Sequence, residues 1–508
     1  MKVLSAQQIR QADAYTIAHE PISSVDLMER AATAATQALI NHLQRKAFTP
    51  RQMHFFCGRG NNGGDGLVMA RLLSSAYKVH VWICPIPENP SADFAVNLQR
   101  LEQLNRGIAI QTLTPDMPFP PLQKDDLCVD CLFGSGLNRP PEGLAAALIA
   151  YLNSTDAYKV AIDIPSGLFA DKPVSDASKV FHANYTLTFE LPKQSFLYDH
   201  HYRFTGEWEI VSIGLHTDFL NNAATQVFYS DLDMVKKCYQ PRKKIAHKGD
   251  FGHALIVAGS MGKMGAAMLA AAAALRAGVG LLTAAVPAFG LPLMQVAVPE
   301  AMCVPNLGDI ALQHLPDVTP YSSIGIGPGI GQHKDTADAI EALLTKSNLP
   351  PMVWDADALN LLAKNPHWWE QIPAGSILTP HPKEFERLVG VATTDFARHE
   401  WQLRLSSKYR CIVVLKGAHT CITTPNGISY FNATGNPGMA TGGSGDVLTG
   451  ILTALLAQNY PAETAAVLGV FLHGLAGDLA AAKLSQPAMK AGDIVDSLPA
   501  AWQQITQV

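Results

Sequence analysis

A glycine-rich segment directly ahead of an apolar run is the feature that most constrains this chain. Residues 436–446 read NPGMATGGSGD, and residues 447–456 are predominantly apolar. Glycines at a helix start let backbone N–H groups close around an anion, and the helix dipole favours negative charge there. A carboxylate at that position, Asp446, is unfavourable unless it acts as a base. The segment therefore predicts a phosphoryl-transfer site in which Asp446 accepts a proton from a substrate hydroxyl. The alternative is an ordinary glycine-rich turn that caps a buried helix.

Length and composition favour a multidomain α/β protein. The chain has 508 residues, which is enough for two or more domains. Apolar residues make up 48% and charged residues 16%, a balance that suits buried α/β cores rather than disorder. The net charge is -5 and the sequence has no long basic run, so composition argues against a nucleic-acid partner.

Targeting and redox signals are weak. The sequence has no uninterrupted apolar run of about 18 residues, so we expect no membrane span. The N-terminus lacks the apolar stretch of a signal peptide, and we expect a cytoplasmic protein. Cys128 and Cys131 have CxxC spacing, but they lie in an apolar run and no second pair exists. We interpret them as half-buried strand residues rather than a zinc or redox site.

A polar stretch at residues 231–244 separates two halves, each with its own glycine-rich segment. This predicts domains at residues 1–230 and 231–508. In each half, apolar strand-like runs alternate with helical stretches, which predicts two three-layer α/β/α domains with mostly parallel sheets. The expected strands of the first half are 54–57, 79–83, 127–130, 160–163 and 185–189. Those of the second half are 253–257, 281–286, 323–326, 352–354, 376–378 and 411–415, followed by a hairpin of 421–424 and 428–431.

The glycine-rich segment of the first half, residues 58–66, lies between an expected strand and an expected helix. Ligands of open α/β sheets bind at the carboxyl ends of strands, and Asp130 and Asp163 end two further strands. Arg139 is suited to pairing with a phosphate, and capping of nearby loops is the alternative role of the two aspartates. The segment does not match the GxGxxG dinucleotide fingerprint. The oxygen ligands suited to a cation are those of Asn62, Asp130 and Ser166.

Three motifs of the first half together resemble the NAD(P)H-hydrate epimerase family, the YjeF N-terminal domain. They are NNGGDG at 61–66, FGSGL at 133–137 after Asp130, and DIPSG at 163–167, within a resemblance that spans roughly residues 1–215. It implies a Rossmann-like fold and a catalytic role for Asp163, although spacing does not distinguish acid–base chemistry from binding. One departure is Lys193-Gln-Ser195, where the family usually has Lys-Pro-Gly. The resemblance implies a K⁺ site at Asn62, Asp130 and Ser166, and substrate contacts at Asn61, Asn62, Gly63, Gly64, Asp65, Gly134, Ser135, Gly136, Leu137, Asn138, Arg139, Pro140 and Asp163.

Polar residues at the strand ends of the second half indicate a nucleotide site. Lys416 ends an expected strand, where it and the backbone beyond it can hold phosphates; a solvated lysine is the alternative. His381 lies between two prolines, a position that by itself favours an ordinary surface or core histidine. Asp355 and Asp357 flank another strand end, and helix capping is as well supported there as a magnesium or phosphate role.

Ordered motifs from about residue 240 onward resemble the ADP-dependent NAD(P)H-hydrate dehydratase family, a branch of the ribokinase-like fold. They include GPGIG at 327–331, DADAL at 355–359, LTPHPKEF at 378–385, LKGAH at 415–419 and TGGSGD at 441–446. The resemblance implies Mg²⁺ accompanying ADP. It implies substrate contacts at Ala266, Gly329, His381 and Asp446, and nucleotide contacts at Lys416, Gly417, Ala418, His419, Thr420 and Gly445.

The two halves together resemble the family of bifunctional NAD(P)H-hydrate repair enzymes. Hydration of a ring double bond gives the 6-hydroxy hydrates NADHX and NADPHX as S and R epimers. The resemblance implies that the N-terminal domain interconverts the epimers and that the C-terminal domain dehydrates the S epimer with ADP, giving NAD(P)H, AMP and phosphate. Asp446 would deprotonate the 6-hydroxyl, and we expect a homo-oligomer. The alternatives are a ribokinase-like small-molecule kinase fused to a nucleotide-binding module, and a non-catalytic N-terminal half.

Overall fold

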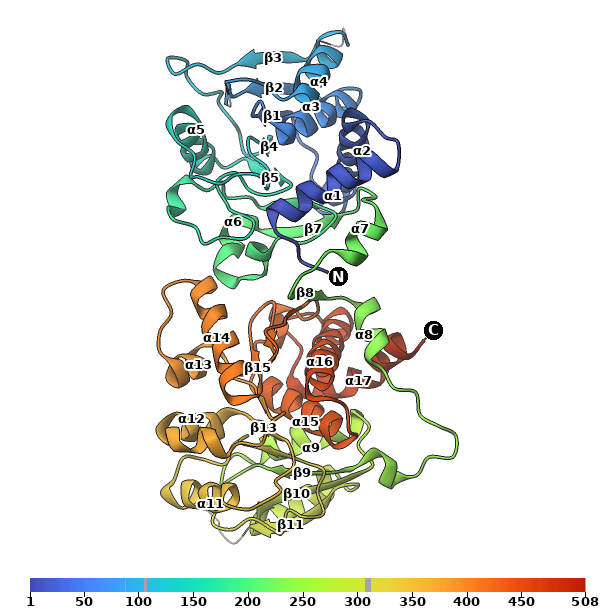
Figure 1. Ribbon diagram of the computed structural model, residues 1–508, viewed down its shortest axis with the longest axis vertical. Helices are drawn as coiled ribbons and strands as arrows, with labels where there is room; N and C mark the ends of the chain where they lie inside the picture. The colour runs from blue at the N-terminus through green and yellow to red at the C-terminus, as the bar shows by residue number, and fades with distance from the viewer. Residues whose placement is uncertain (87, 105–106, 307–311, 508) are drawn as a thin grey trace. The chain divides into compact units, whose positions relative to one another are not determined.

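The computed structural model describes all residues except 87, 105–106, 307–311 and 508. The chain forms two compact units, Lys2–Thr225 and Gln226–Val508, and Met1 belongs with the second (Figure 1). Each unit has its own sheet and its own core, so each is described by itself.

The N-terminal domain contains a seven-stranded sheet in the order β3-β2-β1-β4-β5-β6-β7, and every pair of neighbours is parallel. The strand order reverses between β1 and β4, which is the position where open α/β sheets bind ligands. The prediction of a parallel sheet is therefore confirmed for this half. The strands are β1 Met53–Cys57, β2 Val79–Ile83, β3 Ala109–Thr112, β4 Leu127–Cys131, β5 Tyr158–Ile162, β6 Tyr185–Phe189 and β7 Glu207–Val211.

Helices cover both faces of this sheet. Apolar side chains of α2, α3 and α4 form one core with the strands, and α5 packs in a second core on the opposite face (Figure 1). Cys128 and Cys131 are buried strand residues of these cores, so their sites are more buried than expected. The helices are α1 Ala6–His19, α2 Ser24–Arg45, α3 Asn61–Leu73, α4 Ala92–Glu102, α5 Gly143–Ser154, α6 Tyr202–Thr205 and α7 Thr217–Asn222.

The C-terminal domain contains a ten-stranded mixed sheet in the order β11-β10-β9-β12-β13-β14-β15-β16-β17-β8. Strand β16 is antiparallel to β15 and β17, which confirms the predicted hairpin; the other neighbours are parallel. The strands are β8 Val227–Ser230, β9 His253–Val257, β10 Leu281–Pro287, β11 Met302–Asn306, β12 Ser323–Ile326, β13 Met352–Trp354, β14 Ile377–Leu378, β15 Ile412–Leu415, β16 Cys421–Thr423 and β17 Ser429–Asn432.

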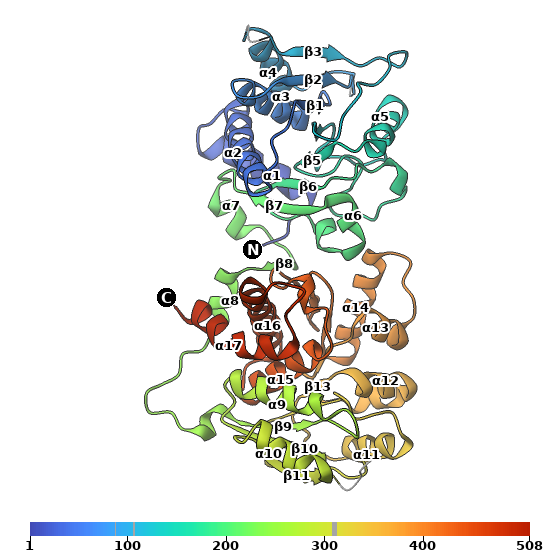
Figure 2. The ribbon, with the colours of Figure 1, turned by 180° about the vertical axis from the view of Figure 1, so that it is seen from behind.

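This sheet is also covered on both faces (Figure 2). Helices α9, α15, α16 and α17 share one core, and α11, α12 and α14 share the other, so both domains have the predicted three-layer α/β/α architecture. Helix α16 is long and apolar enough to cross a membrane, but 72% of its apolar window is buried inside the domain, as in a core helix. The helices are α8 Leu232–Cys238, α9 Met264–Arg276, α10 Leu291–Ala297, α11 Lys334–Leu344, α12 Ala356–Lys364, α13 Pro382–Val389, α14 Asp395–Tyr409, α15 Ser444–Ala457, α16 Ala462–Leu484 and α17 Ala491–Thr506.

The boundary between the units lies between Thr225 and Gln226, whereas the polar composition placed it after residue 230. Strand β8 causes the difference, because it pairs in register with β17 and so belongs to the second sheet. Ion pairing of the Met1 amino group with Asp231 likewise joins the first residue to the second unit. The two units therefore divide shortly before the polar stretch.

Candidate functional site

The N-terminal domain has a cavity of about 460 Å³ at the carboxyl ends of β1, β4 and β5. Most of the residues predicted to contact substrate line it. Among the described residues, the predicted contacts that do not line it are Gly63, Gly64 and Pro140. Those that do are Asn61, Asn62, Asp65, Gly134, Ser135, Gly136, Leu137, Asn138, Arg139 and Asp163.

Gly63 and Gly64 permit close packing beneath the cavity. Helix α3 begins at Asn61, so part of the glycine-rich segment, which was expected to precede the helix, forms its first turns. A Cβ atom at Gly63 would lie 1.7 Å from the Gly58 carbonyl oxygen, and one at Gly64 would lie 2.6 Å from the sulfur of Met28. Only glycine lets the helix start lie this close to the preceding loop and to α2.

Asp163 is a fixed anion at the end of β5. Its backbone has φ 65°, in the left-handed region, and turns the side chain toward the cavity. One carboxylate oxygen lies 2.9 Å from Lys193 Nζ, and the other accepts a hydrogen bond of 2.9 Å from the Ser135 backbone N–H. Burial by itself would raise the pKa of Asp163, but the charge of Lys193 and these hydrogen bonds outweigh it and hold the pKa below its ordinary value.

Lys193 supplies the positive charge of this site. Its side chain is 0% exposed, and Nζ also donates to the carbonyl oxygens of Phe189 at 3.2 Å and Leu191 at 3.3 Å. The ammonium group therefore has three acceptors for its three N–H bonds. Sequence reasoning noted Lys193 only as the start of a departure from the family motif, and it missed this buried ion pair.

Two further carboxyl groups, Asp13 on α1 and Asp65 on α3, line the same cavity. Burial, with repulsion from Asp163, Asp13 and Asp93, raises the pKa of Asp65 well above its ordinary value. Burial and repulsion from Asp163 raise the pKa of Asp13 to about 6. Asp65 was predicted as a substrate contact, whereas Asp13 was missed because nothing in the pattern of the opening helix indicates a site.

Asn62, Asp130 and Ser166 lie together beside this cavity. The buried Asn62 Oδ1 has no hydrogen-bond partner among the described residues, and its Nδ2 donates to the Phe133 carbonyl at 2.9 Å. Asp130 accepts from the Ser166 hydroxyl at 2.7 Å and from the backbone N–H groups of Ser166 and Leu132 at 2.8 and 3.1 Å. Asp130 therefore does cap the two loops, the role that the sequence left as the alternative. Asn62 Nδ2 and the Ser166 hydroxyl both contact the Phe133 carbonyl, at 2.9 and 3.5 Å, so the three residues belong to one polar cluster. Oxygen atoms of this kind are the ligands that a hard cation prefers.

Two cavities of about 660 and 780 Å³ meet at the start of α15 in the C-terminal domain. Gly443 and Asp446 line the first cavity, and Ser444 and Gly445 line the second. Three predicted substrate contacts, Ala266, Gly329 and Asp446, lie in the first cavity. Lys416, Gly417, Ala418, Thr420 and Gly445, which were predicted to bind nucleotide, line the second together with His381.

The turn before α15 places Asp446 at this junction. Gly443 has φ 93°, and a Cβ atom there would lie 2.5 Å from Leu269 Cδ1. The first backbone N–H groups of a helix have no intrahelical partner and can bind an anion. Of those at the start of α15, the Ser444 N–H makes a long hydrogen bond of 3.4 Å to the Thr441 carbonyl. Burial and then repulsion from Asp355 raise the pKa of Asp446 to about 6, with Lys416 opposing them. A carboxylate with that pKa is suited to general-base catalysis near neutral pH.

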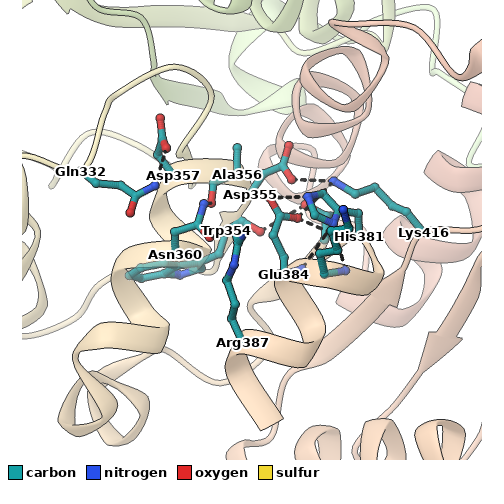
Figure 3. A network of polar contacts seen from close by, with 12 residues as sticks. Gln332, Trp354, Asp355, Ala356, Asp357, Asn360, His381, Glu384, Arg387 and Lys416 are labelled. Carbon is teal, nitrogen blue, oxygen red and sulfur yellow. Dashed lines mark hydrogen bonds and ion pairs between the residues drawn. The ribbon is translucent and has the colours of Figure 1, made fainter. Parts of the chain in front are cut away.

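Asp355 and Lys416 form an ion pair beneath this turn (Figure 3). Lys416 Nζ lies 2.9 Å from Asp355, whose other oxygen accepts a hydrogen bond of 2.8 Å from Thr449. Asp355 is the N-cap residue of α12, but its side chain makes no capping bond, so helix capping is the wrong interpretation for it. The solvated alternative for Lys416 is also wrong, because Asp355 and Glu384 hold its pKa above the ordinary value despite burial.

Asp357 takes no part in the Asp355–Lys416 pair and contacts the loop before α11. Its carboxylate accepts hydrogen bonds from the Gly331 backbone N–H at 2.9 Å and from the Gln332 side chain at 3.1 Å. The same carboxylate lines the cavity that holds Asp446. It is therefore accessible to a ligand of that cavity.

Comparison with known proteins identifies the family of the chain. Residues 24–195 match the family described as YjeF-related protein N-terminus, and residues 254–500 match the family described as NAD(P)H-hydrate dehydratase. A bifunctional NAD(P)H-hydrate repair enzyme from Moorella thermoacetica is 38% identical over 98% of this chain and 96% of its own length. The chain belongs to the bifunctional NAD(P)H-hydrate repair enzyme family. The resemblances inferred for both halves are thereby confirmed.

A second relative covers nearly the whole chain, whereas a solved structure covers only part of it. The NAD(P)H-hydrate repair enzyme of Escherichia coli is 35% identical over 93% of this chain and 88% of its own length. The ADP/ATP-dependent NAD(P)H-hydrate dehydratase of Bacillus subtilis, co-crystallised with ATP/Mg²⁺, is 31% identical. It covers 56% of this chain and 100% of its own, with a TM-score of 0.48.

Two histidines, His381 and His419, do not line the cavities in which the sequence placed them. His381 Nδ1 accepts the backbone N–H groups of Lys383 and Glu384 at the start of α13, at 3.1 and 3.3 Å, so the ring proton is on Nε2. His381 lines the cavity of the predicted nucleotide contacts rather than that of Asp446. His419 is not a lining residue of either cavity among those described, and its ring contacts the Asn432 carbonyl at 3.2 Å.

Proposed function

We propose that this enzyme repairs hydrated NADH and NADPH in two steps carried out by separate domains. The N-terminal domain interconverts the R and S epimers at C6. The C-terminal domain dehydrates the S epimer, with ADP as the phosphoryl donor. Relatives named as bifunctional NAD(P)H-hydrate repair enzymes match nearly the whole chain. The observation that carries the proposal is the position of Asp446, between one cavity with the predicted substrate contacts and another with the predicted nucleotide contacts.

In the dehydratase reaction, Asp446 takes the proton of the 6-hydroxyl group, and the oxygen attacks the terminal phosphorus of ADP. The bond from that phosphorus to the bridging oxygen breaks, and AMP leaves with the electron pair. Backbone N–H groups at Gly443, Ser444 and Gly445 stabilise the negative charge that develops, and Lys416 adds a positive charge. Phosphate then leaves C6 with the bonding electron pair, while C5 loses a proton and the ring double bond returns. The products are NAD(P)H, AMP and phosphate. Phosphate is a far better leaving group than hydroxide, which explains why a phosphoryl donor is needed.

Residues suited to Mg²⁺ lie beside Asp446. Asp357 and Glu384 present carboxylate oxygens to the same cavity, the ligand type that Mg²⁺ prefers. When bound with the nucleotide, Mg²⁺ neutralises phosphate charge.

The residues beside the epimerase cavity fit a K⁺ ion. Asn62 Oδ1 is a buried acceptor without a donor among the described residues, and Asp130 and Ser166 add further oxygens. Burial raises the pKa of Asp130 to about 6, although hydrogen bonds from Ser166 and Leu132 oppose this. Asn62, Asp130 and Ser166 would hold the ion, which supplies positive charge next to the loop that is proposed to bind substrate phosphates.

Removal of one proposed ligand should weaken the epimerase and its response to K⁺. Asn62→Ala is preferable to a change at Asp130, because Asp130 also caps two loops. Even outer-shell partners of a metal are worth about 10–100-fold in affinity, so we expect the K⁺ concentration for half-maximal epimerisation to rise at least tenfold. Chromatography of the two hydrates at varied K⁺ measures this, and dehydratase activity of the same sample is the control. An unchanged K⁺ response would remove Asn62 from the site.

Mixed hydrate epimers, incubated with the full-length protein, test the proposed function. Without ADP, the epimer ratio should relax to equilibrium with no loss of hydrate. With ADP, both epimers should disappear, and the near-ultraviolet absorbance of NAD(P)H should return in proportion to the AMP formed. A stable phosphorylated product without that absorbance would instead identify a kinase.

A further inference from the structure

The epimerase cavity is lined by more acidic groups than a phosphate-containing substrate needs. Three of them have donors: Asp163 pairs with Lys193, Asp93 accepts from Ser24, and Glu190 accepts from the Ile213 backbone. Asp13 and Asp65 have no hydrogen-bond donor or ion-pair partner among the described residues. The charged groups that line the cavity from every element are Arg10 and Asp13 of α1, Asp65 of α3, Asp93 of α4, and Arg139, Asp163 and Glu190 of the loops.

Asp163 is a poor proton carrier despite its central position. Lys193 and the Ser135 N–H hold both of its oxygens, and Lys193 itself has three acceptors. Protonation of Asp163 would leave the buried ammonium of Lys193 without its counter-charge, which is costly at a fully buried site. The pair therefore supplies a permanent, oriented carboxylate.

Asp65 differs from Asp163 because its pKa is shifted in the opposite direction. It is 9% exposed and lines the cavity, it has no partner among the residues that the structure describes, and nearby carboxylates repel it. Burial and these neighbours raise the pKa of Asp65 well above its ordinary value and so favour the neutral form. A group that holds its proton so strongly can donate a hydrogen bond, but it does not release the proton readily.

Asp13 is intermediate between Asp163 and Asp65 in how readily it gains and loses a proton. It is only partly buried, it is not anchored by a donor, and it lies near both Asp163 and Asp65. A carboxyl group that exchanges its proton easily must be free to titrate near the working pH and must reach the ligand. Of the three aspartates, only Asp13 meets both conditions.

We propose that Asp13 is the catalytic acid–base of epimerisation, acting in the same cavity as Asp65 and as the Asp163 carboxylate that Lys193 anchors. This rests on the epimerase function proposed above. Asp13 gives its proton to the 6-hydroxyl group, and the C6–O bond breaks with its electron pair leaving as water. The ring N1 lone pair forms a double bond to C6, and the resulting cation lies among the carboxylates of Asp13 and Asp163. Water adds to the other face of C6, and its surplus proton returns to Asp13.

The balance of this cycle requires nothing beyond the substrate and water. One proton moves from Asp13 to the leaving oxygen and one returns from the entering water, so the enzyme ends in its starting state. The cation is stabilised by an acidic cavity, which accounts for the excess of carboxylates. The same cavity without Asp13 would still bind substrate but would have no group to protonate the hydroxyl.

Asp13→Asn in the full-length chain tests the proposal. Loss of a general acid typically costs about 10²–10⁴ in rate, so kcat for epimer exchange should fall by that factor while KM changes little. Because Asp13 acts in its protonated form, wild-type kcat/KM should fall as pH rises through about 6, the pKa of this carboxyl, and Asp13→Asn should lack that limb. Asp13→Glu should keep the limb, and Asp116→Asn, an exposed aspartate of the same domain, should match the wild type.

Epimer exchange is followed by chromatography after subtraction of the rate in buffer. An Asp13→Asn variant within about threefold of wild type, or one that retains the limb near pH 6, overturns the role of Asp13. Loss of activity in both Asp13→Asn and Asp13→Glu, together with a changed thermal transition of the N-terminal domain, also overturns it in favour of a structural role. If the wild type does not exchange epimers, the epimerase function itself fails, which is a separate outcome.

Discussion

Asp446→Asn is expected to lower the dehydratase rate by about 10²–10⁴ while ADP still binds, because the amide keeps the shape of the side chain but cannot take the hydroxyl proton. The wild-type rate should rise with pH through about 6 and then level, since the base must be ionised and the pKa of Asp446 is raised to about 6. The variant should lack this rise. Initial rates of NAD(P)H formation across pH and calorimetric titration with ADP measure the two effects.

A matched control separates catalysis from a general loss of charge. Asp338 lies on α11 with its side chain 60% exposed, so Asp338→Asn removes the same charge from the same domain outside both cavities. It should retain the wild-type rate and pH profile. Turnover of Asp446→Asn near the wild-type value, or a pH rise that persists, would show that another group is the base.

Asp163→Asn is expected to abolish epimerisation and to destabilise the N-terminal domain. Asparagine tolerates the left-handed backbone of this position, so the change adds little strain. It leaves Lys193, which is 0% exposed, as an uncompensated buried charge, and breaking a buried pair in this way costs about 3–5 kcal/mol. Calorimetry of the full-length protein should show a lower transition temperature for the N-terminal domain and no change for the other.

A second substitution distinguishes stability from chemistry at this pair. Lys193→Met added to Asp163→Asn removes the stranded cation and fills its volume with an apolar side chain. Most of the lost stability should return, because replacing both partners of a buried pair is often nearly neutral. Epimerisation should stay absent, since the oriented carboxylate is still missing. If the double variant regains activity, Asp163 only supports the structure.

The strands that the sequence patterns did not predict all lie at the edges of the two sheets. The described structure adds β3, β7, β8 and β11 to the expected strands, and these are the two edges of each sheet. Edge strands face solvent on one side, so their residues are partly exposed and do not form continuous apolar runs. Central strands are buried on both faces and were therefore predicted within one or two residues. Strand β8, one of these edges, also explains why the units divide shortly before the polar stretch.

Local sequence determined the chemistry of each site and the element that carries it. Neighbouring residues predict three of these features, because backbone conformation depends on nearby side chains. They are the glycines that allow close approach, the carboxylate at the start of α15 and the lysine at the end of β15. The tertiary structure alone decided which charges meet. Asp355 pairs with Lys416 and Asp163 with Lys193, and Asp13 reaches the same cavity from the opening helix. These contacts join residues far apart in the chain, and burial and charge at such contacts set the pKa that makes a carboxyl group an anchor or a proton carrier.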